Sequence, residues 1–185
     1  RGPEEYDRIA QCIEGVISGR HGNYLVFLPS YAFMKEVADA FEYDHCDHKR
    51  IDTIRQTQNM GEQERADFLG RFETSSDEHS LIGFAVLGGI FSEGIDLKHD
   101  SLIGVIIVGT GIPQVCSERE MLRQYFDGTG VNGYDYAYCY PGMNKVLQAA
   151  GRVIRTEDDL GVVALLDERF TRMKYLRLFP REWTN

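Results

Sequence analysis

A glutamine and two arginines stand at helical spacing in the stretch QAAGRVIR, residues 148–155. If this stretch is helical, Gln148, Arg152 and Arg155 share a face while Ala149 and Ala150 allow close packing behind them. A guanidinium presents a rigid fork of donors that matches the oxygens of a phosphate. The spacing therefore indicates a phosphate-binding group, although ion pairs with the acids at 157–159 are an equally ordinary use of such arginines.

A second candidate group follows the apolar run Tyr24 to Leu28, which has the length of a buried strand. Directly after it come Pro29, Ser30 and Tyr31, and a hydroxyl beside an aromatic ring suits a phosphate and a base. The ordinary interpretation of Ser30 is that it caps the next helix.

A third group, GGIFSEGID at residues 88–96, follows the apolar run 81–87. Its glycines allow close approach of the backbone to a ligand, and Asp96 is suited to accept a hydrogen bond from a ribose hydroxyl. The ordinary interpretation is a turn at the glycine pair and a helix cap at Ser92.

These groups need a scaffold, and the pattern of apolar residues predicts one. Helical spacing covers residues 4–18, 31–43 and 61–72, and apolar runs of strand length cover 24–28, 51–54, 81–87, 102–108 and 162–166. Strands that are apolar throughout and alternate with helices indicate an α/β fold with a mostly parallel sheet covered on both faces. Ligands of such sheets bind beyond the carboxyl ends of the strands, so we expect all three groups at that edge.

Two structures are compatible with the segment from residue 114 to 140. Met121, Leu122, Tyr125 and Phe126 suggest a helix. The tyrosines further on alternate with a period of two, which favours a strand, although a helix ahead of Pro141 also fits; they are Tyr134, Tyr136, Tyr138 and Tyr140.

Composition limits the class of protein. With 185 residues and 43% hydrophobic content, we expect one core and a single domain over residues 1–185. The net charge of -9 repels nucleic acid overall, so any contact with it must be local. No apolar run reaches the length of a membrane span and no leader pattern opens the sequence, so we expect a cytoplasmic protein without a membrane partner, nucleoid-associated if the source is bacterial.

The four cysteines are far apart and form no CxxC pair, which indicates reduced thiols that mainly pack. The cluster Asp44-His45-Cys46-Asp47-His48 contains metal-ligand types, but its spacing fits no common tetrahedral site. We therefore expect no metal site in this chain.

One absence is informative about mechanism. The sequence contains no GxxxxGK followed by Ser or Thr, and no D-E-x-H run that would hold magnesium. Arginines suited to a triphosphate are present, but the loop that binds a triphosphate is missing. We therefore expect this domain to work opposite another one.

Three blocks of this sequence resemble the second RecA-like domain of superfamily 2 helicases of the DinG/XPD type, the iron–sulfur DNA helicases. LVFLPSY ending at Tyr31 resembles motif IV, GGIFSEGIDL at 88–97 resembles motif V, and QAAGRVIR at 148–155 resembles motif VI. The closing segment up to Phe170, with its D-x-R-F pattern, is also similar to the family. The resemblance implies a RecA-like, P-loop NTPase-type three-layer sandwich.

The resemblance also implies roles for individual residues. Arg155 matches the arginine finger, Arg152 its phosphate-contacting neighbour, and Gln148 a residue that couples nucleotide state to domain closure. Gly94 and Asp96 would line the nucleotide. The positions that match residues facing the DNA strand are Ser30, Tyr31 and Ser92, with Gln58 as a further candidate in the same groove.

The function implied is that of the second motor domain of a 5′ to 3′ DNA helicase. ATP and Mg²⁺ would be bound mainly by an N-terminal RecA-like domain, the partners would be that domain and single-stranded DNA, and a monomer is expected. The family allows an iron–sulfur cluster outside this segment, and we expect this chain alone to be inactive. Two alternatives stay open: a stand-alone nucleotide-binding α/β protein that uses the glycine pair, and a non-catalytic interaction module.

Overall fold

The computed structural model describes residues 2–74, 76, 78–92, 102–153 and 160–183. Short π-helical or 3₁₀ turns stand between several of the main elements. The helices and strands follow one another in the order α1 (Pro3–Ile17), β1 (Asn23–Leu28), α2 (Tyr31–Ala40), β2 (Ile51–Arg55), α3 (Glu62–Gly70), β3 (Ser80–Val86), β4 (Gly104–Val108), α4 (Ser117–Gly128), α5 (Tyr140–Ala150), β5 (Val162–Leu166) and α6 (Met173–Leu176).

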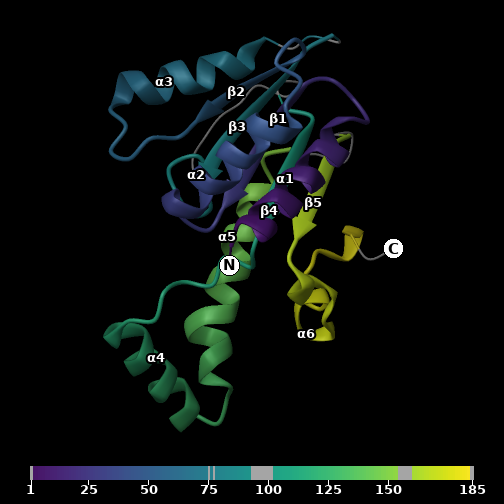
Figure 1. Ribbon diagram of the computed structural model, residues 1–185. Helices are drawn as coiled ribbons and strands as arrows, with labels where there is room; N and C mark the ends of the chain where they lie inside the picture. Colours follow the sequence, from purple (N-terminus) through teal and green to yellow (C-terminus); the bar gives the residue numbers. More distant parts are fainter. Residues whose placement is uncertain (1, 75, 77, 93–101, 154–159, 184–185) are drawn as a thin grey trace.

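The strands form one five-stranded sheet in the order β2-β3-β1-β4-β5, and every pair in it is parallel (Figure 1). All five predicted strands are present. The predicted parallel α/β fold is therefore confirmed. Because the strands are parallel, their carboxyl ends lie along one edge of the sheet, which we call the carboxyl edge.

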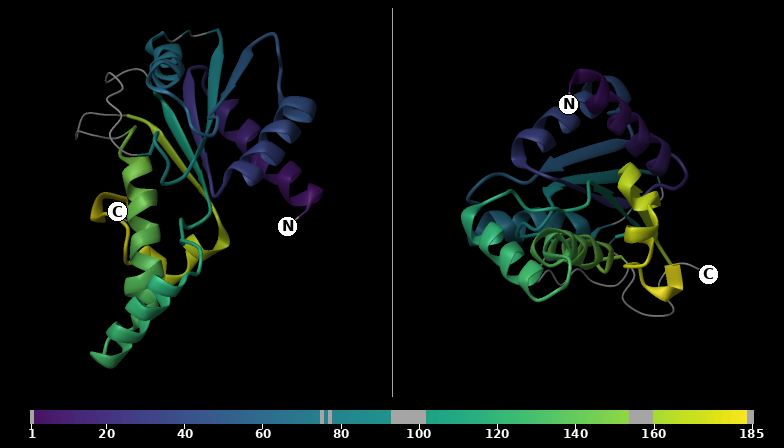
Figure 2. Two further views of the ribbon diagram at one scale, coloured as in Figure 1. Left: turned by 90° about the vertical axis from the view of Figure 1, so that its left-hand side faces the viewer. Right: turned by 90° about the horizontal axis from the view of Figure 1, so that it is seen from below.

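Side chains that alternate along each strand build a separate core on each face of the sheet. In β1, Leu25 and Phe27 join the core that contains residues of α3 and α5, whereas Val26 and Leu28 join the core that contains residues of α1 and α2. All four are fully buried. The sheet therefore lies between two helical layers, as Figure 2 shows, and this explains why its strands are apolar throughout.

The segment from α4 to α5 is helical and projects beyond the carboxyl ends of the strands (Figures 1 and 2). A π-helical turn, Asp135–Cys139, leads directly into α5. Tyr134 stacks on Tyr138 with ring centroids 5.2 Å apart, and Tyr136 meets Tyr140 edge to face at 5.1 Å. In a helix, residues four apart share a face while residues two apart point in nearly opposite directions. The alternating tyrosines thus form two opposite faces of a helix and not a strand.

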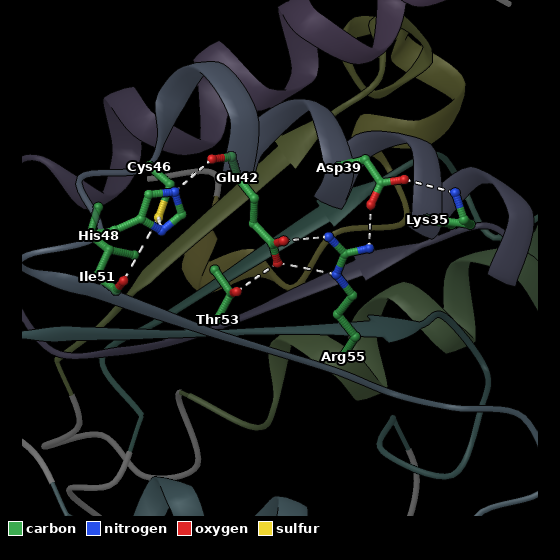
Figure 3. Close-up of polar contacts among 8 residues, drawn as sticks. All are labelled: Lys35, Asp39, Glu42, Cys46, His48, Ile51, Thr53 and Arg55. Atoms are coloured by element: carbon green, nitrogen blue, oxygen red, sulfur yellow. Dashed lines mark hydrogen bonds and ion pairs between the residues drawn. The ribbon is translucent and has the colours of Figure 1, made fainter.

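Strand β2 lies at an edge of the sheet, and charged side chains of the α2 region cover it. Arg55 forms ion pairs with Asp39 at 2.6 Å and Glu42 at 2.7 Å, and Thr53 donates to Glu42 at 2.6 Å (Figure 3). Lys35 extends the network through Asp39. Charged side chains on an edge strand oppose pairing with another chain.

Both histidines of the Asp44–His48 cluster form hydrogen bonds within the protein. His45 lies between Asp7 and Glu14 of α1, with each ring nitrogen 2.8 Å from a carboxylate oxygen. His48 contacts the Cys46 sulfur and the carbonyl oxygen of Glu42 (Figure 3). Burial, with nearby carboxylates, raises the pKa of Cys46 to about 11, so this thiol stays protonated at neutral pH. Within the described ranges, no three His, Cys, Asp or Glu side chains are grouped to hold a metal ion.

None of the helices that the structure describes is both long enough and apolar enough to span a membrane.

Candidate functional site

Helix α5 runs antiparallel to the strands and connects the two edges of the sheet. At its start, Gly142 packs against the backbone of Thr110 and Gly111, just beyond the carboxyl end of β4. At its end, Val153 lies beside Gly161 and Ile103, which precede the amino ends of β5 and β4. The expectation that residues 148–155 lie at the carboxyl edge is therefore wrong for the described part of that stretch. The reason is geometric, because a helix that connects two parallel strands must return the chain to the opposite edge.

The predicted helix over 148–155 is shorter in the structure. Helix α5 ends at Ala150, with Gly151 as its cap, and a turn continues through hydrogen bonds from Arg152 N to Ala149 O and from Val153 N to Ala150 O, each 3.2 Å. Both alanines are buried, as their small size suggested, and Gln148 is exposed. Gln148 and Arg152 thus lie close together at the end of α5. Arg155 lies outside the described residues.

Arg152 connects the two motif-bearing segments. Its Nη2 donates a hydrogen bond of 3.0 Å to the carbonyl oxygen of Ser92. Hydrogen bonds that fix a guanidinium reduce the side-chain freedom it would lose on meeting an anion. The end of α5 and the 88–92 turn therefore form one unit. Gly94 and Asp96, predicted to line a nucleotide, follow this turn but lie outside the described residues.

Ser92 lies in the interior. Its side chain is fully buried, and its hydroxyl donates to the carbonyl oxygen of Gly89 at 2.8 Å. Gly89 N in turn bonds Val86 O at 3.0 Å, so the glycine pair forms the turn that the ordinary interpretation suggested. The predicted contact of Ser92 with a DNA strand does not fit this placement. The sequence could not reveal that the Ser92 side chain points inward, since serine is common in turns whether its side chain is buried or exposed.

Ser30 and Tyr31 lie at the carboxyl edge, directly after β1. The Ser30 hydroxyl accepts a hydrogen bond of 3.2 Å from Phe33 N and so caps α2, yet the residue is half-buried and its hydroxyl proton is available to a ligand. The Tyr31 hydroxyl accepts from Gln56 Nε2 at 2.8 Å. The structure thus brings these two predicted residues together at one edge.

Gln56 is a site residue that the sequence analysis missed. It follows β2, is only 3% exposed, and also accepts a hydrogen bond of 2.9 Å from Val86 N at the end of β3. One amide therefore joins the carboxyl ends of β1, β2 and β3. The available signal was its position as a polar residue two places after a predicted strand. Gln58, which was predicted to reach the strand, is exposed in the next turn.

A large groove lies at the other half of the carboxyl edge, and we call it the α1–β4 groove. It has a volume of about 1110 Å³. Helix α1, the loop after β4, the start of α5 and the loop after β5 form its walls, and its lining includes Arg8, Pro29, Thr110, Ile112, Lys145 and Asp167.

Arg169 holds Asp167 at the rim of this groove with two side-chain hydrogen bonds of 2.8 and 2.6 Å. Burial acts to raise the pKa of Asp167, but the hydrogen bonds from the Arg169 side chain and backbone outweigh it, so the pKa is lowered. Asp167 therefore stays ionised, and its charge is balanced inside the protein.

A five-stranded parallel sheet between two helical layers, with no phosphate loop of its own, defines the class of the chain as a RecA-like α/β domain. The family model described as "Helicase C-terminal domain" matches residues 13–185. The chain belongs to this family, within the DinG/XPD type of helicases.

Several curated relatives are helicases by name. The chain is 29% identical over 166 residues to "ATP-dependent DNA helicase chl-1" of Caenorhabditis elegans, covering 89% of this chain and 20% of the relative. It is 27% identical over 168 residues to "Probable ATP-dependent helicase MJ0942" of Methanocaldococcus jannaschii, covering 84% and 25%. It is 38% identical over 89 residues to "ATP-dependent DNA helicase DinG" of Photobacterium profundum, covering 47% and 13%. The chain thus spans a quarter or less of each of these relatives.

Solved structures support the fold. A structure titled XPD helicase superposes with a TM-score of 0.75 at 22% identity, covering 96% of this chain and 30% of that one. A second, titled XPD apo, gives 0.74 at 21% identity, covering 96% and 34%. The predicted RecA-like fold is confirmed.

Proposed function

We propose that this chain is the second motor domain of an ATP-dependent DNA helicase that moves 5′ to 3′ along single-stranded DNA. The observation that carries the proposal is the hydrogen bond from Arg152 to the Ser92 carbonyl, because it couples the motif V turn to the motif VI segment. The family membership of the chain and the names of its relatives also support a helicase function.

The proposed mechanism is closure of two RecA-like domains over ATP and Mg²⁺, which the first domain would bind. Phosphoryl transfer depends mainly on positioning and on stabilising charge, and an arginine finger typically contributes about 10³- to 10⁵-fold in rate. Arg155 would be this finger. Arg152, anchored on Ser92, would contact phosphate beside it, and the exposed Gln148 would sense closure. Gly94 and Asp96 would line the sugar side of the nucleotide.

The strand would follow the carboxyl edge. Ser30 and Tyr31 offer a hydroxyl and an aromatic face there, and Gln58 is exposed in the turn after β2. Aromatic faces bind bases without sequence preference. Ser92 would act indirectly, since its backbone holds Arg152 while its side chain is buried. Hydrolysis at the opposite side of α5 would then reopen the domains and shift the strand.

The test is Arg155→Ala and Arg155→Lys in a parent protein that carries both motor domains. We expect DNA-stimulated ATP hydrolysis to fall by about 10³-fold or more in both variants, because a lysine cannot reproduce the bidentate fork. Nucleotide binding, measured by a fluorescent analogue, should be largely retained. Arg123→Ala is the matched control, since Arg123 lies on α4 in ion pairs with Glu120 and Asp127. Near wild-type hydrolysis by the Arg155 variants would exclude the finger role.

A second experiment separates this function from a stand-alone enzyme. The isolated chain should neither hydrolyse ATP nor be stabilised strongly by mononucleotides in a thermal-shift assay, because it has no phosphate loop. Robust turnover by the pure chain would instead support a self-sufficient nucleotide enzyme.

A further inference from the structure

The α1–β4 groove is not explained by the residues assigned so far. Its volume of about 1110 Å³ is slightly above the range of roughly 300–1,000 Å³ typical of small-molecule pockets. Ser30 and Tyr31 follow Pro29, which is part of its lining. The groove is therefore continuous with the part of the carboxyl edge where the strand is proposed to lie.

Most charges around the groove are already balanced within the protein. Asp167 is held by Arg169, and Glu168 forms an ion pair of 3.0 Å with Arg172. Glu5 also has an interaction within the chain. Arg8 and Lys145 differ from these residues, because neither forms an ion pair or a hydrogen bond with any residue that the structure describes. Two unpaired cations thus face the groove, one from α1 and one from α5.

The side chain of Lys145 packs against Gly88. A Cβ atom at Gly88 would lie 2.8, 2.9 and 3.2 Å from the Cδ, Cε and Nζ atoms of Lys145. The absence of a side chain at position 88 therefore lets the lysine stem lie over the turn after β3. The side chain of Lys145 therefore lies at the carboxyl edge, where it also lines the groove.

The lining of the groove also includes apolar side chains. Pro29, Val108, Ile112 and Pro113 contribute apolar surface, and Thr110 is almost fully buried. A groove that combines two cations with apolar surface suits a ligand whose negative charges are separated by uncharged parts. A phosphodiester chain has this character, because its phosphates alternate with sugars and bases.

We propose that the α1–β4 groove binds the phosphodiester backbone of the single strand, with Arg8 and Lys145 each contacting a phosphate. This inference rests on the proposed function and adds two backbone contacts to it. Such contacts carry no sequence information, which fits a motor that must move along any sequence. They also supply the local positive charge that a chain of net charge -9 needs.

The test measures binding of a fluorescent oligo(dT) to the parent protein over a series of salt concentrations. Each lost phosphate contact on a single strand lowers the slope of log K against log salt by about 0.7. Arg8→Ala and Lys145→Ala should therefore each lower the slope by about 0.7, and the double variant by about 1.4. Lys145→Arg should retain the wild-type slope. Lys49→Ala is the control, since Lys49 is exposed in the turn before β2, at the opposite edge.

The outcomes separate the two proposals. If the wild-type protein does not bind the oligonucleotide, the proposed function itself fails. If the wild-type protein binds it and the variants keep an unchanged slope, only this inference is overturned. Inorganic phosphate and ATP serve as competitors. One result would overturn the phosphodiester assignment: millimolar phosphate or ATP displaces the oligonucleotide from the wild-type protein but not from the double variant. The groove would then be assigned to a free anion or a mononucleotide.

Each variant must first be shown to be folded, by its circular dichroism and melting temperature. The charge reversal Lys145→Glu provides a second measurement. It should weaken binding further than Lys145→Ala at low salt, because repulsion replaces attraction. Equal affinities for these two variants at low salt would also contradict the proposal.

Discussion

The two ends of helix α5 lie in different surroundings. Its first turn packs backbone to backbone on the loop after β4, next to an open groove that Lys145 also lines. Its last turn leads to Arg152, whose guanidinium is fixed by the Ser92 carbonyl. One helix thus presents a loosely held cation at one edge of the sheet and a firmly held one toward the other.

This difference follows from the parallel sheet. A connecting helix crosses from one edge to the other, so residues a few turns apart reach opposite sides of the domain. Under the proposed function, the two ends serve two ligands. A group that stabilises a transition state gains from being fixed in advance, whereas cations that track a sliding strand need no fixed geometry.

The largest expected effect tests the first turn of α5. In Gly142→Ala, the new Cβ would lie 2.6 Å from Thr110 O and 2.9 Å from both Gly111 C and Ile112 N. Backbone atoms cannot move aside as a flexible side chain can, so we expect the free energy of unfolding to fall by about 3 kcal/mol. Urea unfolding measures it. If Gly142→Ala were as stable as wild type, the close packing of α5 on the β4 loop would be refuted.

Gly15→Ala is the matched control for this substitution. Gly15 lies within α1, and apart from its chain neighbours and the backbone of its own helix nothing lies within 4 Å of its added Cβ. Alanine favours a helix over glycine, so this variant should be more stable by about 0.5–1 kcal/mol.

A smaller effect is expected at Gln56. Gln56→Leu removes the nearly fully buried amide that joins Tyr31 to Val86 and leaves the partly buried Val86 N–H without that partner. We expect a loss of about 2 kcal/mol, since an unsatisfied buried group costs roughly 1–3 kcal/mol. Gln58→Leu, at an exposed position two residues further on, should stay within about 0.5 kcal/mol of wild type. Equal stabilities for the two variants in urea unfolding would show that Gln56 does not organise this edge.

The fold was largely readable from the sequence because its strands carry a strong signal. A strand buried on both faces is apolar at every position, so β1 and β3 were identifiable without knowledge of their partners. The helix cap at Ser30 was also readable, because serine directly after a strand commonly caps the next helix. The alternation of Tyr134 to Tyr140 could not decide between a strand and a helix, since a period of two also results when two opposite faces of one helix are aromatic.

The candidate site was harder to predict, because the roles of its residues depend on where their side chains point and on the course of α5, which the sequence does not give. Nothing in the motif around Ser92 tells whether its hydroxyl points outward or bonds Gly89. The position of Arg152 away from the carboxyl edge follows only when α5 is traced back across the sheet. Gln56 was hidden because the two partners of its side chain, Tyr31 and Val86, are distant from it in sequence.

The smallest expected effect concerns the wall of the groove that carries Arg8. His45 holds α1 to the end of α2, since its two ring nitrogens each lie 2.8 Å from the Asp7 and Glu14 carboxylates. Both nitrogens must donate to such acceptors, which requires the imidazolium form. The hydrogen bond to Asp7 raises the pKa of His45, burial opposes this, and the bond to Glu14 adds to the rise. A raised pKa in the folded state stabilises the fold, and this stabilisation is complete when the pH is below the pKa of histidine in the unfolded chain, about 6.5. The stabilisation is lost as the pH rises through the pKa of His45 in the folded protein.

His45→Gln should therefore lower the free energy of unfolding by about 1 kcal/mol at pH 6. The effect is small because both carboxylates are about half exposed, so that solvent screens their interaction with His45. The difference from wild type should shrink steadily toward pH 9 in urea unfolding. In the background Asp7→Asn/Glu14→Gln, His45 loses its charged partners, so His45→Gln should show no such pH dependence there. A difference that stays constant with pH in the native background would mean that His45 packs as a neutral ring. In that case, charge would not fix the wall of the groove that carries Arg8.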